Sequence, residues 1–240
     1  MTLAMWGSIS LGAQPEAKCS LKTLKGFYIY GATGVKGNVV HVEGGQEIFD
    51  GKGGITNTYT DSSGSVTVTS GSYEMSDYCI GRATYHDTGD SYVMYTGPDG
   101  TEFSWLSISK GTEIAGREVR VSPSVKPKCS LRTLKGTYIY SYMGYRNGIR
   151  YFESGQERFD GHGNFVNNYT GANGEATVTT GTYTMERNCI GTTTYNDTGE
   201  SYAVYVSPAG DEFRYVSLGS GLKNIAVGSE QRVSRSIIKP

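Results

Sequence analysis

The chain contains a long internal repeat. Residues 18–111 align without a gap to residues 128–221, and about half of the aligned positions are identical. A period of about 110 residues is too long for a solenoid unit and close to the usual size of an independent domain. We therefore expect an N-terminal tail or signal remnant over residues 1–17 and two homologous domains over residues 18–124 and 125–240. Positions at which the two copies differ show what each site tolerates.

Composition indicates an all-β fold. The 34 glycines and 19 tyrosines, with many Thr, Ser and Val residues, favour short strands joined by tight turns. No segment keeps the apolar spacing of three and four residues that a helix needs, so no helix is expected. A net charge of −1 gives no electrostatic attraction to nucleic acid or to an anionic membrane. Nothing in the chain is long and apolar enough for a membrane span.

The pattern predicts eight or nine short strands in each copy. Because they follow one another as hairpins without a long crossover, an eight-stranded antiparallel barrel is favoured over a sandwich. At the sequence Asp50-Gly51-Lys52-Gly53, the glycines supply the positive φ that a hairpin with a bulge requires. In the first copy, strands are expected at 27–30, at a segment ending with 46–49, and at 55–60, 66–69, 71–75, 80–85, 91–95, 102–107 and 118–121.

Differences between the copies indicate which side chains point into each barrel. Ile48 corresponds to Arg158, so this position is expected to face solvent. Its neighbours on the strand then face the interior, because alternate side chains lie on opposite faces of a sheet. By the same reasoning, the interior set is Glu47, Phe49, Ile55, Asn57, Tyr59, Tyr73, Met75, Phe103 and Trp105 in the first copy, and Glu157, Phe159, Phe165, Asn167, Tyr169, Tyr183 and Met185 in the second.

Glu47 and Glu157 are the candidate catalytic residues. A carboxyl group inside an aromatic-lined cavity has a raised pKa and can act as a general acid or base near neutrality. The alternative is a structural cluster in which each glutamate is hydrogen-bonded within a filled core. The candidate substrate-binding residues on the same inner face are Phe49, Asn57, Tyr59 and Tyr73, with Phe159, Asn167, Tyr169 and Tyr183 in the second copy.

The cysteines recur with the same 60-residue separation in both copies. One disulfide in each domain, Cys19 to Cys79 and Cys129 to Cys189, is the simplest hypothesis; four reduced, buried thiols are the alternative. Disulfides would place the protein in an oxidising compartment, so it is expected to be secreted or periplasmic. The cytoplasm stays open under the alternative.

Other polar residues suggest structural roles. Asp50 precedes glycine in a tight turn and is expected to cap its own backbone. Arg120 and Arg232 either bind an acidic group of a ligand or have a structural role, in which they clamp a terminus or pair with Glu102 and Glu212. All three histidines are replaced in the other copy, so we expect no metal site and no Ser-His-Asp triad. No cofactor is expected, because no phosphate-binding glycine loop opens a helix.

Several short motifs recur in the same order in both copies. They are Cys-Ser-Leu-x-x-Leu-x-Gly-x-Tyr from Cys19, Phe-Asp-Gly-x-Gly from Phe49, Gly-x-Tyr-x-Met from Gly71, Cys-Ile-Gly from Cys79 and Arg-Val-Ser from Arg120. Together they resemble the allene oxide cyclase-like barrels of bacteria and fungi, relatives of plant allene oxide cyclases and dirigent proteins. The resemblance covers each repeat and implies an eight-stranded, calycin-like barrel with an apolar cavity. It carries over no catalytic residue, because the chain departs from the plant enzymes outside the glycine and aromatic framework.

Two functions remain after these steps. The first is a cofactor-independent isomerase or cyclase that orients a small apolar or polyketide-like substrate inside a barrel. The second is a binding or carrier protein for an apolar metabolite or peptide. A homo-oligomer is left open. One barrel is expected to be a scaffold, and the bulky Tyr142, Met143 and Tyr145 suggest that the second mouth is the obstructed one.

Overall fold

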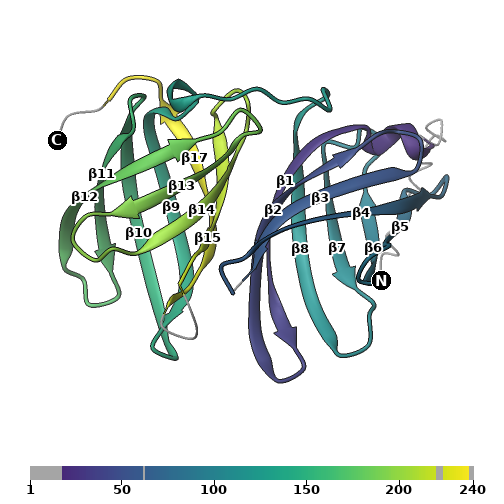
Figure 1. Ribbon diagram of the computed structural model, residues 1–240, viewed down its shortest axis with the longest axis horizontal. Coiled ribbons are helices and arrows are strands. Elements are labelled where there is room, and N and C mark those ends of the chain that lie inside the picture. Colours follow the sequence, from purple (N-terminus) through teal and green to yellow (C-terminus); the bar gives the residue numbers. More distant parts are fainter. Residues whose placement is uncertain (1–17, 62, 220–223, 238–240) are drawn as a thin grey trace, which may run out of the picture.

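A computed structural model describes residues 18–61, 63–219 and 224–237. They form two closed antiparallel β-barrels in tandem, which lie side by side (Figure 1). This confirms the predicted fold class. The expected tail or signal remnant at residues 1–17 lies outside the described residues. Within the described ranges, no helix has the length and apolar character needed to cross a membrane.

The first barrel consists of eight strands, each paired with the next, and β8 pairs with β1 to close it. A short 3-10 helix precedes β1. The elements are η1 (Leu21–Leu24), β1 (Gly26–Lys36), β2 (Val39–Phe49), β3 (Gly54–Asp61), β4 (Val66–Met75), β5 (Ile80–Tyr85), β6 (Ser91–Thr96), β7 (Glu102–Ser107) and β8 (Thr112–Ser122).

The second barrel repeats this topology with one interruption. Its last edge is divided into β16 and β17, which both pair with β9. The elements are η2 (Leu131–Thr133), β9 (Lys135–Arg146), β10 (Ile149–Asp160), β11 (Asn164–Gly171), β12 (Ala176–Met185), β13 (Ile190–Tyr195), β14 (Ser201–Val206), β15 (Glu212–Ser217), β16 (Asn224–Ile225) and β17 (Val227–Ser234).

Two details differ from the sequence prediction. The segments predicted as separate strands at 66–69 and 71–75 form the single strand β4, because Gly71 keeps its place in the ladder opposite Ile55 and Tyr85. The 3-10 helices were not expected. Each is too short for periodicity to reveal, and each is fixed by a capping box, in which Ser20 and Thr23 bond to each other's backbone in η1.

One end of each barrel is packed solid. In the first barrel, Phe49 lies 5.0 Å from Tyr73 and 5.3 Å from Tyr28 between ring centroids, in edge-to-face contacts. Helix η1 covers this end with Leu24, which is fully buried. The disulfide between Cys19 and Cys79 fastens the start of the domain to the β4–β5 turn. The second barrel repeats the arrangement with its own disulfide, Cys129 to Cys189.

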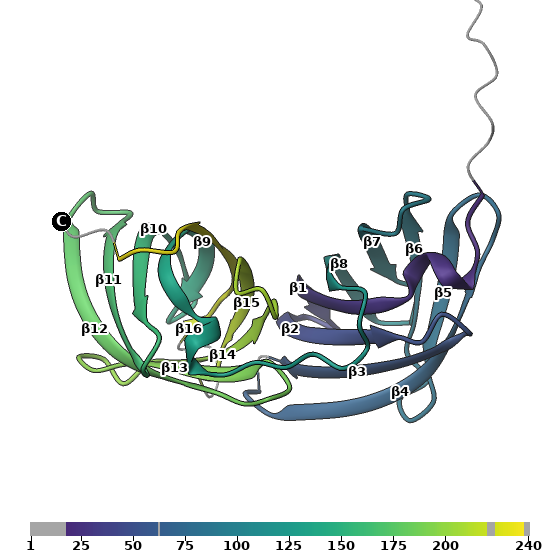
Figure 2. The same cartoon turned by 90° about the horizontal axis from the view of Figure 1, so that it is seen from above.

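The two barrels pack against each other through their outer surfaces. The outer faces of β1 and β2 contact β14, β15 and β17, as the view from above shows (Figure 2). Ile29 and Val216 are fully buried there. The hydroxyl groups of Thr60 and Tyr205 form a buried hydrogen bond of 2.7 Å across the contact. We call this contact the inter-barrel interface.

The interface corrects one expectation. Ile48 and Arg158 were expected to face solvent, but Ile48 packs against the interface cluster. Arg158 is also only 8% exposed, although it lies on β10, outside the inter-barrel interface. The assignment of the faces still holds, because both side chains point outward from their barrels. What the comparison of copies could not reveal is that an outer face can be covered by another barrel.

Candidate functional site

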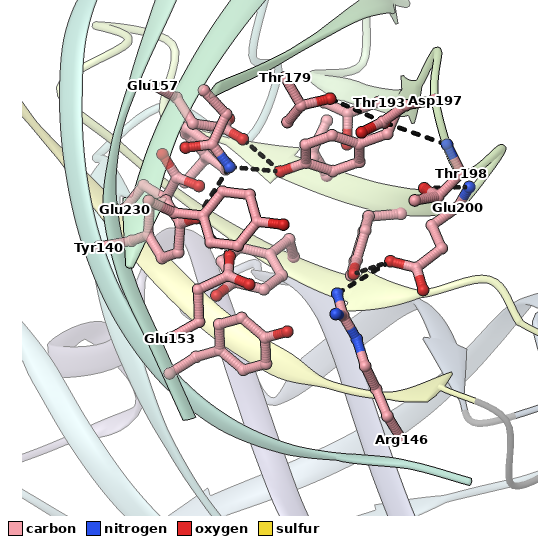
Figure 3. Close-up of a pocket in the computed structure, with 18 residues that line it drawn as sticks. Tyr140, Arg146, Glu153, Glu157, Thr179, Thr193, Asp197, Thr198, Glu200 and Glu230 are labelled. Atoms are coloured by element: carbon pink, nitrogen blue, oxygen red, sulfur yellow. Dashed lines mark hydrogen bonds and ion pairs between the residues drawn. The ribbon is translucent and has the colours of Figure 1, made fainter. Parts of the chain in front are cut away.

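The open half of the second barrel contains a cavity of about 50 Å³. This is several times the roughly 10–15 Å³ that one water molecule needs. It lies at the end opposite to η2, between the β9–β10 hairpin and the β13–β14 turn. Figure 3 shows that the lining side chains converge on it from all around the barrel. They are Tyr140, Tyr142, Arg146, Glu153, Glu157, Asn167, Tyr169, Thr179, Thr193, Tyr195, Asp197, Thr198, Glu200, Tyr202, Val204, Phe213, Tyr215 and Glu230.

Three carboxyl groups line the inner side of the cavity. Burial raises the pKa of Glu157 to about 8, although a hydrogen bond from Tyr195 partly offsets the effect. Burial, together with the charge of Glu157, raises the pKa of Glu230 well above its ordinary value. Burial also raises the pKa of Glu153. The environment therefore favours the protonated form of Glu230, and Glu157 titrates near neutral pH.

Hydrogen bonds fix the orientation of these carboxyl groups. The Tyr195 hydroxyl donates to Oε1 of Glu157 at 2.5 Å. Nδ2 of Asn167 donates to the hydroxyl oxygens of Tyr195, at 3.1 Å, and Tyr140, at 2.8 Å. The Tyr140 hydroxyl in turn donates to Glu153. The result is a network that holds Glu157 and Glu153 at fixed positions on β10, four residues apart on the same inner face.

Some polar atoms in the cavity have no partner. Among the described residues, none forms a hydrogen bond with Oη of Tyr215, Oε2 of Glu230 or Oδ1 of Asn167. Buried polar atoms of this kind are normally paired, so they are available to a ligand. They include a donor and acceptors, which suits a ligand that carries hydroxyl or carbonyl oxygens.

An ion pair lies at the mouth of the cavity. Nη2 of Arg146 is 3.2 Å from a carboxylate oxygen of Glu200, and the guanidinium carbon lies 4.1 Å from the ring centroid of Tyr151. Figure 3 shows this pair on the side of the cavity away from Glu157 and Glu230. A ligand larger than the cavity would enter by displacing these two side chains.

The first barrel has an equivalent but shallower cavity of about 40 Å³. Its inner carboxyl pair, Glu47 and Glu118, does not line it. Burial raises the pKa of Glu47 to about 7, an effect that hydrogen bonds from Tyr85 and Tyr92 partly offset. The lining residues are Lys36, Glu43, Asn57, Tyr59, Thr69, Tyr85, Thr88, Asp90, Tyr92, Trp105, Ser107, Thr112 and Ile114.

Side-chain volume explains why one carboxyl pair is sealed and the other is accessible. Trp105 fills the first barrel where the second has the smaller Tyr215. The backbone beside each ring is glycine: a Cβ atom on Gly116 would lie 2.6 Å from the Trp105 ring, and one on Gly228 would lie 2.3 Å from Oη of Tyr215. Glycine at this position therefore leaves space for a large ring in both barrels. Only in the second barrel is the ring small enough for Glu230 to line the cavity.

The structure divides the residues that sequence patterns placed inside the barrels. Asn57 and Tyr59 line the first cavity. Glu157, Asn167 and Tyr169 line the second. Phe49, Phe159, Tyr73 and Tyr183 belong to the packed ends instead, where the Tyr73 hydroxyl donates to the Leu21 carbonyl and the Tyr183 hydroxyl donates to the Leu131 carbonyl. These four side chains therefore pack in the core and line neither of the two cavities.

The mouth also differs from the expectation. Of the bulky residues predicted to obstruct the second barrel, only Tyr142 lines the cavity. Met143 lies outside and is 53% exposed, and Tyr145 packs against the inter-barrel interface. Met143 and Tyr145 therefore do not obstruct the second cavity. The cavity is also polar, whereas the family resemblance implied an apolar one.

Sequence reasoning missed the partner glutamates. Glu118 and Glu230 lie on the last strand, and each is followed two residues later by the arginine of the shared motif, so both copies read Glu-x-Arg-Val-Ser. This shared glutamate was the available signal. The tyrosines that bond to Glu47 and Glu157, Tyr85 and Tyr195, are likewise shared between the copies.

The remaining candidates have structural roles. Nη2 of Arg120 donates to the Asp99 carbonyl at 2.6 Å, and Nη2 of Arg232 donates to the Ala209 carbonyl at 2.8 Å. Both arginines therefore clamp loops at the packed ends. Oδ1 of Asp50 accepts hydrogen bonds from two backbone N–H groups of its own turn. In the part of the chain that the structure describes, no group of three or more His, Cys, Asp or Glu side chains is arranged to hold a metal ion.

The fold and the site together define a tandem β-barrel protein with a carboxyl and tyrosine cavity. Comparisons with family models and with curated proteins give no match. Among solved structures, the chain is similar to kievitone hydratase from Nectria haematococca, with 9% identity and a TM-score of 0.29 over 95% of this chain and 96% of that chain. It is also similar to a DUF3598 family protein of unknown function from Nostoc punctiforme, with 9% identity and a TM-score of 0.29 over 92% and 100% of the two chains. Similarity at this level assigns no activity and no site residue to this chain.

Proposed function

We propose that the second barrel is a cofactor-independent isomerase or cyclase that acts on a small apolar or polyketide-like substrate. The observation that carries this proposal is the pair Glu157 and Glu230, which reaches the cavity while the equivalent pair in the first barrel is sealed. A protonated acid and a carboxyl group that titrates near neutrality are what an enzyme needs to move a proton within one substrate. The first barrel then serves as a scaffold.

The residues have distinct roles in this reaction. Ionised Glu157 removes a proton from the substrate, and protonated Glu230 donates a proton to another atom of the same molecule. The product has the same composition as the substrate. Glu157 then loses its proton to solvent water and Glu230 takes up a proton from solvent water, which restores the starting state. The free Oη of Tyr215 donates a hydrogen bond to a substrate oxygen on which negative charge develops. Tyr195 and Asn167 hold Glu157 in position.

Deuterium incorporation tests this function while the substrate is still unidentified. Extracts of the producing cells are incubated with the protein in D₂O, and chromatography with mass spectrometry detects compounds that change retention time and gain one deuteron. Glu157→Gln and Glu230→Gln should abolish the conversion. Glu118→Gln, the matched change in the sealed pair of the first barrel, should leave it intact. Equal conversion by Glu157→Gln and the wild type would refute the assignment.

The alternative function is a carrier for an apolar metabolite or peptide. The tyrosine-rich lining favours it, because burial raises the pKa values of Tyr140, Tyr142 and Tyr202 and keeps their hydroxyls neutral, as suits binding without chemistry. Native mass spectrometry of protein isolated from its producer would detect a retained ligand. A carrier holds that ligand unchanged and still binds it after Glu157→Gln.

We further propose an extracytoplasmic location and the allene oxide cyclase-like ancestry that the sequence motifs suggest. The two disulfides support the location, since such bonds persist in oxidising compartments. Thiol titration of the unfolded, unreduced protein should find no reactive cysteine among Cys19, Cys79, Cys129 and Cys189. The two eight-stranded barrels and the order of the shared motifs support the ancestry.

A further inference from the structure

Each barrel uses only one of two complementary faces in the inter-barrel interface. The first barrel contributes the outer face of β1 and β2, and the second contributes the outer face of β14, β15 and β17. The face of the second barrel that corresponds to β1 and β2 lies outside this contact. So does the face of the first barrel that corresponds to β14, β15 and β17. We call them the β9–β10 face, marked by Ile139 and Phe152, and the β5–β7 face, which is marked by Ile80, Tyr95 and Leu106 and continues onto β8, the counterpart of β16 and β17.

Part of the β9–β10 face is apolar and exposed, whereas Thr137 and Arg158 at the other end of this face are buried. Ile139 corresponds to Ile29 and Phe152 to Val42, and both counterparts belong to the interface cluster. Ile29 is 0% exposed and Val42 is 4% exposed, whereas Ile139 is 46% and Phe152 is 50% exposed. Met143 pairs with Phe152 across the two strands and extends this apolar surface. An exposed cluster of large apolar side chains at such positions marks a surface for association.

The β5–β7 face shows the same relation. Tyr95 corresponds to Tyr205 and Leu106 to Val216, and both counterparts are fully buried in the interface cluster. Tyr95 is 54% exposed and Leu106 is 49% exposed. The counterparts of the interface residues Ile29, Val42, Tyr205 and Val216 are therefore exposed on the two outer sides of the chain.

We propose that a second copy of this chain docks its β5–β7 face on the β9–β10 face of the first copy, which repeats the inter-barrel interface between molecules. The contact is head-to-tail, since two different surfaces meet. One copy of a pair keeps a free β9–β10 face and the other keeps a free β5–β7 face. This inference is independent of the proposed function, because neither face contributes a residue to the cavity.

Differences between the internal and the proposed contact compensate each other in size. Within the chain, Gly31 lies so close to Val227 that a Cβ atom on the glycine would be 2.9 Å from that side chain. On the β9–β10 face the glycine is replaced by the larger Ser141. On the neighbouring part of the β5–β7 face, the valine is replaced by the smaller Ala115. The larger side chain on the β9–β10 face is thus matched by a smaller side chain on the surface that it would contact.

Charge is also complementary. Arg150 replaces Val40, which packs against the interface cluster, and Glu113 replaces Ile225, which belongs to that cluster. Both charged side chains are exposed. One basic and one acidic residue have therefore appeared on opposite partners of the proposed contact, where opposite charges fix the partner and its register.

Sedimentation velocity of the full chain over a range of concentrations tests the proposal. The wild type should assemble beyond the monomer as concentration rises. Phe152→Arg and Leu106→Arg should each raise the dissociation constant at least about tenfold, because a charge is buried in the contact. Val178→Arg, at an exposed apolar position on β12 outside both faces, is the matched control and should assemble like the wild type.

Mixing the two variants distinguishes a head-to-tail contact from any other. The Phe152→Arg chain keeps an intact β5–β7 face, and the Leu106→Arg chain keeps an intact β9–β10 face. An equimolar mixture should form a one-to-one pair and nothing larger, and this outcome also shows that both variants are folded. A wild type that stays monomeric up to its solubility limit would overturn the proposal, as would a mixture that stays monomeric.

Discussion

The buried carboxyl group of Glu157 makes a quantitative prediction about stability. Its pKa is raised from 4.5 to about 8, chiefly by burial. At about 1.4 kcal/mol per pH unit, ionised Glu157 destabilises the folded protein by about 5 kcal/mol relative to protonated Glu157. The folded-state pKa lies above the unfolded value. The stability due to the protonated group is therefore fully present below pH 4.5 and is lost as the pH rises through about 8.

Glu157→Gln removes this pH dependence, because the amide is neutral at every pH and its oxygen still accepts the hydrogen bond from Tyr195. The free energy of unfolding is measured by urea titration with circular dichroism. The variant should gain about 5 kcal/mol relative to the wild type between about pH 4 and about pH 9. Any cost of the substitution that does not depend on pH cancels in this difference.

Two controls keep the measurement specific. Glu186→Gln changes the net charge equally at an exposed position and should give no comparable change with pH. Trp105 lies in the first barrel, so its fluorescence reports whether that barrel unfolds separately. A difference between Glu157→Gln and the wild type that does not grow with pH would show that Glu157 is accessible to solvent. It would refute the acid–base proposal as well.

Three further predictions follow from local contacts. Replacement of Cys19 and Cys79 by Ala should lower the free energy of unfolding by about 4 kcal/mol, because a loop of 60 residues is released in the unfolded chain; urea titration of the variant and of the oxidised wild type measures this, and equal values would contradict it. Tyr195→Phe should raise the pKa of Glu157 further, since the hydrogen bond favours the ionised form, and NMR titration of the carboxyl carbon measures this; an unchanged or lower pKa would contradict it. Asp50→Ala should cost about 1–2 kcal/mol, because two turn N–H groups lose their acceptor, and a thermal midpoint equal to that of the wild type would disprove the capping role.

The sequence by itself determined the architecture. The repeat of about 110 residues defined two domains, and strand alternation placed Glu47 and Glu157 inside two barrels. These features depend on local geometry, since the side-chain period of a strand is two and turn glycines such as Gly51 adopt positive φ, here 77°. The alignment of the two copies also showed which residues are identical in both.

Only the tertiary structure decided which site is accessible and which surfaces are covered. Glu230 reaches Glu157 from the last strand, a contact set by closure of the barrel rather than by spacing along the chain. Glu157 and Glu230 line the second cavity because Tyr215 occupies less volume than Trp105, and no pattern of alternation contains that information. Burial of Ile48 likewise depends on how the two closed barrels pack, because long-range contacts fix the environment of a residue whose direction the local pattern already gives.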